Sequence, residues 1–371
     1  MADANIFWRP DTFGLTMWGR EYDVNDRRYY CFDRNTKLIL LDATENDKVR
    51  EKAEAFFGEK GFVYIYIYTE DEEKVANCMK EAEDPEHTAF ILLSNKAFTR
   101  FEDFFRRTGY PFQLFSVVKL FFELWRPQLR RVYDLLEDDR SRESFSRALA
   151  VRYKLAPYSF NVPTCEGNQY FCIPEMRRFS PDDVFVDCGA YVGETIEKYL
   201  FNREGEIHAI HAFEPGERAF QALTERRSRL IREWALKEDQ LVINKAGVGE
   251  RSGKASLITG DTNELTSLKI SDDADCADGE EIQIVDLDTY FGEKHVSFIK
   301  ADIEGSEMAM LRGARTIIQR DKPMLAICLY HSLSDYYEIP LYLKELAPEY
   351  RFWVRHHTAT IVETVLYACC D

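Results

Sequence analysis

A carboxylate and two glycines follow the spacing D-x-G-x-x-x-G from Asp187 to Gly193, directly after the apolar run Val184–Val186. A short run that is apolar throughout is typical of a strand buried on both faces, and a helix pattern follows Gly193. Glycines at a strand-to-helix turn let the backbone approach a ligand, and the helix N-terminus offers unpaired N–H groups. The stretch therefore indicates a ligand site, and the alternative is an ordinary strand–helix turn.

The same spacing indicates which ligand the turn would accept. Dinucleotide sites use G-x-G-x-x-G, with the pyrophosphate at the helix N-terminus. Here the carboxylate of Asp187 occupies the place that a phosphate would approach. A ligand that carries an ammonium and a sulfonium but no phosphate suits a carboxylate better. The residues therefore favour S-adenosylmethionine.

Composition restricts the partners of this chain. Its 371 residues include 48 Lys and Arg against 65 Asp and Glu, for a net charge of −17. The length predicts two or three domains. Such an acidic surface repels phosphate backbones, so we expect no nucleic-acid partner. We also expect no membrane span, because no apolar run approaches ~20 residues. Nine cysteines without metal-binding spacing, together with an N-terminus unlike a signal peptide, predict a cytoplasmic protein with reduced thiols.

The first part of the chain alternates strand and helix patterns. We expect strands at 38–43, 62–68 and 89–94, and helices at 46–57, 70–83 and 95–108. Alternation at this pitch indicates parallel βαβ units. The acidic, glycine-free stretch 44–47 follows the first strand, so residues 1–110 are expected to form a small Rossmann-like α/β domain without a phosphate loop.

A helical connector is expected at 111–156. Its apolar side chains recur at steps of three and four, as in a heptad stripe: Phe115, Val118, Phe122, Trp125, Leu129, Val132 and Leu136. Pro127 predicts a kink, or a helix boundary near Arg126. The stripe indicates either packing on the chain's own domains or a homodimer formed through residues 115–136.

A second α/β run occupies 157–371. Its expected strands are 184–186, 207–213, 241–243, 282–285, 296–299, 324–329, 351–354 and 361–368. Ligands of such sheets bind at the carboxyl ends of the strands, so the residues just past each strand are the informative ones. Those positions hold Glu214 and Pro215, then Asp302 and Glu304, then His331, and lastly His356 and His357.

From about residue 170 onward the chain resembles the FkbM-type family of S-adenosylmethionine-dependent methyltransferases. The resemblance rests on five blocks in order: VFVDCGAYVGETI (184–196), AFEP (212–215), FIKADIEGSEMAMLRGA (298–314), PMLAICLYH (323–331) and RHHTATIVETVLYA (355–368). It implies a class I methyltransferase domain, with a mostly parallel seven-stranded sheet whose last strand is antiparallel. It also implies O-methylation of a sugar, a glycan or another small hydroxylated metabolite.

Site roles follow from the blocks and the strand ends together. The predicted cofactor-binding residues are Asp187, Gly189, Ala190, Tyr191, Gly193, Thr195, Glu214, Pro215, Ala246 and Asp302. Glu214 is expected to accept the ribose hydroxyls. Glu304, His356 and His357 are expected to contact the substrate, and no metal is predicted, because Asp302 and Glu304 show no third ligand in the sequence.

The predicted catalytic pair is His331 and Asp302. An imidazole with an ordinary pKa near 6.5 is mostly neutral at pH 7 and can accept the hydroxyl proton, while Asp302 orients it. His356 and His357 are alternative bases, and Asp302 could instead cap the following helix. Two other functions stay open for the whole chain: a nucleotide-dependent (NAD-type) oxidoreductase, and a non-catalytic protein that kept the fold.

Overall fold

The computed structural model describes residues 36–370, except 44–46, 60, 83, 85–86, 94–99, 102–103, 106, 109–116, 153–165, 178–179, 260–267 and 272–279. The chain divides into two compact units. The first comprises 1–130 and 149–158, and the second comprises 131–148 and 159–371. Each unit is described by itself below.

The first unit contains a parallel three-stranded sheet in the order β2-β1-β3. Its elements are β1 (Lys37–Asp42), α1 (Asp47–Glu59), β2 (Tyr64–Tyr68), α2 (Glu72–Lys80) and β3 (Thr88–Leu92). The three predicted strands are thus present. The central strand β1 and its neighbour β3 supply the core, where Ile39, Leu41, Phe90 and Leu92 are buried against Phe105. Much of the helix expected at 95–108 lies outside the described residues.

Two helices follow, α4 (Val117–Leu135) and α5 (Asp139–Arg152). Helix α4 continues through Pro127, so the helix boundary predicted near Arg126 is wrong. Asp138 precedes α5, and its Oδ1 accepts a hydrogen bond from the backbone N–H of Ser141 at 2.6 Å. This side chain satisfies one of the N–H groups that a helix start leaves without a backbone partner.

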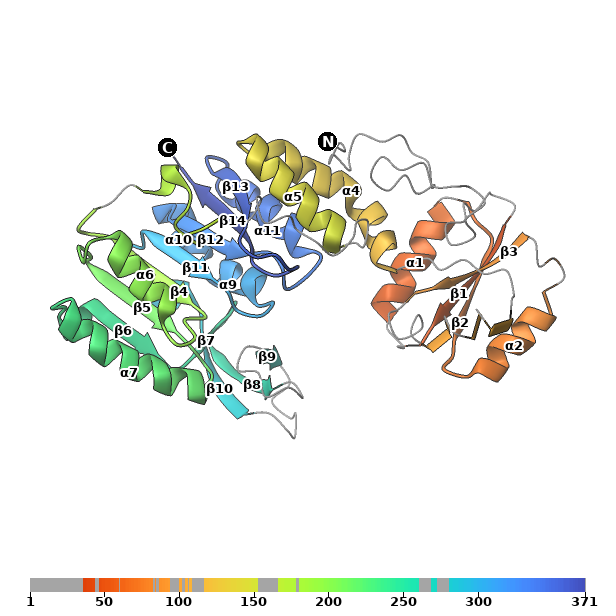
Figure 1. Ribbon diagram of the computed structural model, residues 1–371, viewed down its shortest axis with the longest axis horizontal. Helices are drawn as coiled ribbons and strands as arrows, with labels where there is room; N and C mark the ends of the chain where they lie inside the picture. Colours follow the sequence, from red (N-terminus) through yellow and green to blue (C-terminus); the bar gives the residue numbers. More distant parts are fainter. Residues whose placement is uncertain are drawn as a thin grey trace. The chain divides into compact units, whose positions relative to one another are not determined.

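The second unit is built on a seven-stranded sheet in the order β13-β14-β12-β11-β4-β5-β6 (Figure 1). The strands are β4 (Val184–Cys188), β5 (Ala209–Phe213), β6 (Leu241–Asn244), β11 (Phe298–Ala301), β12 (Met324–Cys328), β13 (Arg351–His356) and β14 (Thr364–Cys369). β4, β5, β6, β11 and β12 are parallel, and β14 runs antiparallel to both neighbours. The sheet predicted from the sequence is therefore confirmed, including its antiparallel last strand.

A smaller four-stranded sheet has the order β7-β10-β8-β9. It consists of β7 (Gly247–Val248), β8 (Gly253–Thr259), β9 (Leu268–Ser271) and β10 (Glu280–Val285). The strand expected at 282–285 belongs to this sheet and not to the large one, so that assignment is corrected. β10 pairs antiparallel with β8, and the burial of its side chains alternates only weakly, so its short apolar run does not reveal which sheet it joins.

Helices cover the large sheet. They are α6 (Glu194–Asn202), α7 (Glu217–Glu233), α8 (Leu287–Phe291), α9 (Glu307–Gly313), α10 (Arg315–Asp321) and α11 (Asp335–Leu346), with short 3₁₀ turns at Pro174–Met176 and Glu238–Gln240. Helices α6 and α7 bury apolar side chains in one core with β4, β5 and β11, where the rings of Phe185 and Tyr199 stack at 4.2 Å. Helices α8 to α11 contact one another.

Among the described residues, no helix is both long and apolar enough to cross a bilayer.

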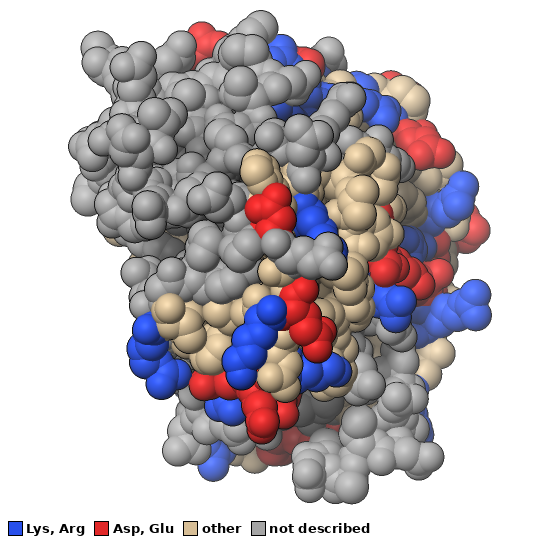
Figure 2. Space-filling view, turned by 90° about the vertical axis from the view of Figure 1, so that its right-hand side faces the viewer, with Lys and Arg blue, Asp and Glu red and all other residues tan. Residues whose placement is uncertain are grey.

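On the face shown in Figure 2, acidic and basic side chains lie interspersed.

Candidate functional site

The glycine turn after β4 lies against the end of β11. Gly189 has φ +76°, and a Cβ built there would lie 1.9 Å from the backbone oxygen of Asp302. Gly193 has φ +86°, and its Cβ would lie 2.7 Å from Leu223 Cδ1 in α7. Both positions therefore require glycine, one because a neighbouring backbone approaches closely and both because φ is positive. The close approach brings the predicted cofactor turn beside Asp302.

Asp187 forms a buried ion pair with a lysine of the adjacent strand. Its side chain is fully buried, and its Oδ1 lies 2.9 Å from Nζ of Lys300 on the adjacent strand β11. Lys300 also donates to the backbone oxygen of Gly189 at 2.6 Å. Burial raises the pKa of Asp187, and the charge of Lys300 opposes that shift. A buried lysine therefore already compensates this carboxylate, and the cofactor contact expected of Asp187 stays a prediction.

Glu214 ties the glycine turn to the end of β5. Its Oε2 accepts from the backbone N–H of Tyr191 at 2.9 Å, and its Oε1 accepts from that of Gly216 at 2.8 Å. Burial raises the pKa of Glu214, while these two backbone N–H groups oppose the shift. The carboxylate is thus held rigidly at the carboxyl edge of the sheet, beside the turn that the sequence assigns to the cofactor.

Asp302 follows β11 and receives two phenol hydroxyls. Tyr170 donates to its Oδ2 at 2.9 Å, and Tyr330 donates to its Oδ1 at 2.8 Å. Burial would raise the pKa of Asp302, but the charges of Lys300 and His331 and the two hydroxyls hold it below its usual value. Asp302 is therefore an ionised carboxylate at neutral pH, fixed in orientation by residues from three segments of the chain.

His331 lies among three carboxylates. Its Nδ1 is 2.8 Å from Oε1 of Glu307, and its Nε2 is 3.5 Å from Oδ1 of Asp302 and 3.6 Å from Oε2 of Glu304. Burial lowers the pKa of His331, but the carboxylates outweigh burial and raise it to about 9. The carboxylates therefore favour the protonated imidazole, whereas the sequence led us to expect a neutral one. The predicted proximity of His331 and Asp302 is present.

Glu307 shapes the loop that carries Glu304. Although it opens α9, it is fully buried, and its two oxygens accept from the backbone N–H groups of Ile303 at 2.9 Å and Gly305 at 3.0 Å. Glu304 takes a positive φ of +54° in this loop, and 38% of its side chain is exposed. Burial raises the pKa of Glu304. Glu304 is thus the most exposed of the three carboxylates around His331, ahead of Asp302 at 22%.

His356 and His357 do not face this group. His356 is fully buried, with Nδ1 at 2.8 Å from the Thr364 hydroxyl and Nε2 at 2.9 Å from the backbone oxygen of Thr360. His357 has Nδ1 at 2.7 Å from the backbone oxygen of Glu166 and Nε2 at 2.8 Å from the Tyr367 hydroxyl.

Both ring nitrogens of each histidine are therefore used inside the chain. Burial lowers the pKa of both side chains, to about 4 for His357. These contacts give both histidines a structural role, and their predicted substrate contacts and base roles stay predictions.

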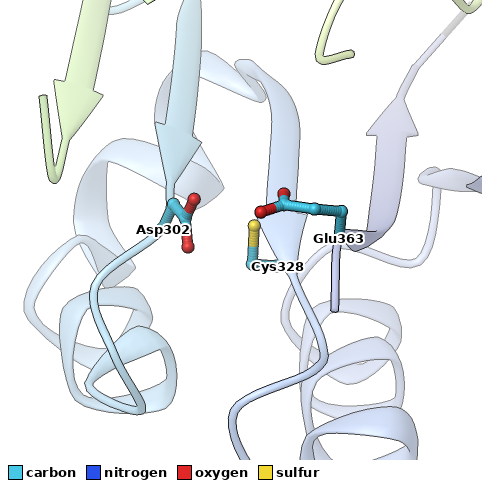
Figure 3. A group of neighbouring side chains, drawn as sticks. All are labelled: Asp302, Cys328 and Glu363. Carbon is cyan, nitrogen blue, oxygen red and sulfur yellow. The ribbon is translucent and has the colours of Figure 1, made fainter. Parts of the chain in front are cut away.

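A second group of side chains shares Asp302 with this site. Figure 3 shows Asp302, Cys328 and Glu363 converging from the ends of β11 and β12 and the start of β14. Glu363 accepts from the side-chain amide of Gln169 and, at 3.4 Å, from the hydroxyl of Tyr330. Burial keeps the pKa of the Cys328 thiol far above its usual value, so it is uncharged.

The remaining predicted cofactor residues also lie at the carboxyl edge of the sheet. Ala190 and Tyr191 are in the glycine turn, Thr195 is buried in the first turn of α6, Pro215 follows Glu214, and Ala246 follows β6. Sequence analysis missed Tyr170, Lys300 and Tyr330 as members of the site. The sequence could have indicated Lys300, because a lone charge inside an apolar strand needs a partner. Nothing in the sequence indicated Tyr170, since it lies 132 residues from Asp302.

Comparison with known proteins agrees with this geometry. Residues 187–357 match the family described as "Methyltransferase FkbM domain". A crystal structure of methyltransferase FkbM from Methylobacillus flagellatus KT aligns at TM-score 0.54 and 20% identity, covering 90% of each chain. A protein described as an rRNA methylase of Clostridium thermocellum aligns over 53% of this chain and 90% of its own, at TM-score 0.34 and 9% identity, which is too weak to support an argument.

No curated protein matches the sequence at a significant level. The family match spans the glycine turn, Glu214, Asp302 and His331, which are the residues that the fold brings to one edge of the sheet. Residues 187–357 of this chain are therefore a methyltransferase domain of the FkbM family.

Proposed function

We propose that this protein transfers the methyl group of S-adenosylmethionine to a hydroxyl of a sugar, a glycan or another small hydroxylated metabolite. The observation that carries the proposal is the placement of three predicted features on adjacent parallel strands. The glycine turn follows β4, Glu214 follows β5, and Asp302 follows β11. Ligands of open α/β sheets bind at this edge.

The roles of the residues follow from their positions. The turn from Gly189 to Gly193 offers backbone to the cofactor, and Glu214 accepts hydrogen bonds from its ribose hydroxyls. Asp302 and Glu304 lie at the edge where an acceptor hydroxyl would meet the methyl group. A sulfonium methyl is a good electrophile, so the protein mainly holds donor and acceptor about 3–3.5 Å apart. His331 already carries a proton, so the hydroxyl proton passes to a carboxylate of this group.

The proposal is tested in two steps on the full chain. Titration calorimetry with S-adenosylmethionine should give one site per chain, and the labelled methyl group should pass to at least one member of a panel of glycans and hydroxylated metabolites. Binding of NAD in place of S-adenosylmethionine would support an oxidoreductase instead. Binding of neither ligand would support a non-catalytic protein.

Glu214 provides the residue-level test. Glu214→Ala should weaken cofactor binding, since charge-assisted hydrogen bonds contribute about 1.5–3 kcal/mol each. Glu214→Gln keeps an acceptor for the backbone N–H of Tyr191 but loses the charge, so we expect roughly tenfold weaker binding. Glu225→Gln, at an exposed position of α7, serves as the control. An unchanged dissociation constant in both Glu214 variants would remove this residue from the site.

A further inference from the structure

The histidine and carboxylates at the ends of β11 and β12 form the densest group of metal-ligating side chains at this edge of the sheet. His331 is 93% buried by side-chain area, since only 7% is exposed. Its Nδ1 lies 2.8 Å from Oε1 of Glu307, but its Nε2 makes no hydrogen bond among the described residues and faces two carboxylates. A buried ring nitrogen without a hydrogen bond is unusual and calls for a partner.

The distances around Nε2 suit a cation. Nε2 of His331 lies 3.5 Å from Oδ1 of Asp302 and 3.6 Å from Oε2 of Glu304. Ligands about 2.1 Å from a shared metal ion lie roughly 3 to 3.5 Å from each other. The ligand atoms of Asp302, Glu307 and His331 all lie within 4.8 Å of one another. The partly exposed side chain of Glu304 would have to move toward Asp302 to share an ion with it.

The other ring nitrogen has the partner that metal-bound histidines usually have. Nδ1 of His331 lies 2.8 Å from Oε1 of Glu307, which two backbone N–H groups hold in place. A carboxylate on the second nitrogen fixes the ring orientation and strengthens the nitrogen that binds the metal. The carboxylate and the histidine of a carboxylate–histidine–metal arrangement are therefore both in place.

We propose that Asp302, Glu304 and Nε2 of His331 bind one divalent cation, with Glu307 positioning the histidine. Binding of the ion displaces the proton from Nε2, because an imidazole nitrogen binds a metal only when it is unprotonated. Two carboxylate oxygens and an imidazole nitrogen suit Mg²⁺, Mn²⁺ and related ions. The sequence alone could not show this site, because the third ligand lies 27 positions beyond Glu304 on another strand end. The site has open positions for substrate oxygens, since only three protein atoms bind the ion.

The group in Figure 3 is the less suitable site. Cys328 is fully buried beside the hydroxyl of Tyr170, at 3.8 Å, and Glu363 already accepts the amide of Gln169. An ion there would also displace the phenol of Tyr170 from Oδ2 of Asp302. An ion on the side of Asp302 that faces His331 leaves the hydrogen bond from Tyr170 to Oδ2 intact and shares Oδ1 with the hydroxyl of Tyr330.

The role of the ion rests on the proposed function. A bound cation would hold the acceptor hydroxyl and lower its pKa, so that its proton passes more readily to a carboxylate of this group and from there to solvent. The oxygen then forms a bond to the methyl carbon as the sulfur–methyl bond breaks, and the electron pair of that bond stays on sulfur. Charges balance, because the sulfonium becomes a neutral thioether while the acceptor loses a proton.

Manganese binding tests the site independently of catalysis. Titration of the full chain with Mn²⁺, followed by electron paramagnetic resonance, should show one bound ion per chain. Asp302→Asn and His331→Ala should each weaken binding by roughly tenfold or more, and Glu307→Gln should weaken it by roughly tenfold through the orientation of the ring. His208→Ala, at an exposed position, should leave binding unchanged.

Three results would overturn the proposal. They are the absence of a stoichiometric Mn²⁺ site in the wild type, unchanged binding in both Asp302→Asn and His331→Ala, and a loss of binding in Glu363→Gln that His331→Ala does not share. His331→Gln replaces the alanine variant if the latter does not fold, as judged by circular dichroism. Calorimetry with S-adenosylmethionine separates the two proposals: cofactor binding without Mn²⁺ binding sinks the metal site alone, and the reverse sinks the proposed function alone.

Discussion

At the scale of single residues, the site depends on a buried ion pair that the chain supplies to itself. Asp187 and Lys300 lie on adjacent strands, and both side chains are at most 3% exposed. Lys300 also holds the backbone oxygen of Gly189 and thereby the start of the glycine turn. The aspartate that the sequence assigns to the ligand therefore acts on the glycine turn through this lysine.

Replacing Lys300 should show how strongly the stability of the fold depends on this ion pair. In Lys300→Met, Asp187 becomes a buried charge without a partner, and removal of one member of such a pair costs about 3–5 kcal/mol. We expect that loss in the free energy of unfolding measured with urea. The double variant Asp187→Asn/Lys300→Met removes both charges and should recover part of it.

Lys254→Met is the matched control, because its ion pair with Glu281 is exposed and such pairs contribute about 0–1 kcal/mol. If Lys300→Met were as stable as this control, Asp187 would not need the lysine.

At the scale of elements, helix α5 is joined to strand β13 by one carboxylate. Asp138 accepts from Nη2 of Arg355 at 2.8 Å and from the backbone N–H of Ser141 at 2.6 Å. Ser141 in turn accepts from Nη1 of Arg355 at 2.7 Å. A single acidic residue thus caps the helix and holds a largely buried arginine of the strand.

This junction should weaken in acid. Burial would raise the pKa of Asp138, but the hydrogen bonds from Arg355 and Ser141 outweigh it and hold the pKa below its usual 3.8. A depressed pKa adds stability that is fully present above pH 3.8 and is lost as pH falls through the lower folded-state value.

Asp138→Asn keeps a capping oxygen but loses the charge. The variant should be less stable than the wild type at pH 7, and the difference should shrink below about pH 4. Thermal unfolding of both proteins between pH 3 and pH 7 measures it. A difference that stays constant over this range would show that the charge of Asp138 does not contribute.

At the scale of the whole molecule, the heptad stripe of residues 115–136 is the surface through which the predicted homodimer would form. Leu129, Val132 and Leu136 of the stripe are buried within the chain, and Leu136 bridges to Phe352 of β13. The C-terminal part of the stripe is therefore already covered, as the first of the two predicted alternatives requires. The side chains of Phe115, Val118 and Phe122 lie outside the described residues.

The homodimer stays a prediction that rests on the N-terminal part of the stripe. If this part forms the interface, Phe122→Glu combined with Trp125→Glu should convert a dimer to a monomer without loss of cofactor binding, because charges are costly to bury at an apolar contact. Arg131→Glu, at an exposed position of the same helix, is the control. Light scattering that shows a monomeric wild type would remove the dimer altogether.

The sequence by itself determined the features that rest on local patterns. The three strands of the first unit, the strands of the large sheet and the glycine turn depend on short runs whose apolar period and glycine spacing act over a few residues. The order of the strands in the large sheet was not predicted from these runs. The five blocks of the second unit also indicated the family, because motifs and their order along the chain can be recognised without knowing which residues are in contact. The positions of Glu214 and Asp302 at the carboxyl edge of the sheet were predicted correctly, because residues that directly follow parallel strands must lie at that edge.

Only the tertiary structure decided which side chains meet and in what charge state. Tyr170 reaches Asp302 across 132 residues, Lys300 takes the carboxylate of Asp187, and Glu307 turns inward to His331 although its position at a helix start suggests a solvated acid. The pKa of His331 depends on three carboxylates and on burial together, so no single motif could give it. Such effects depend on distance through space and on exclusion of water, and neither follows from spacing along the chain.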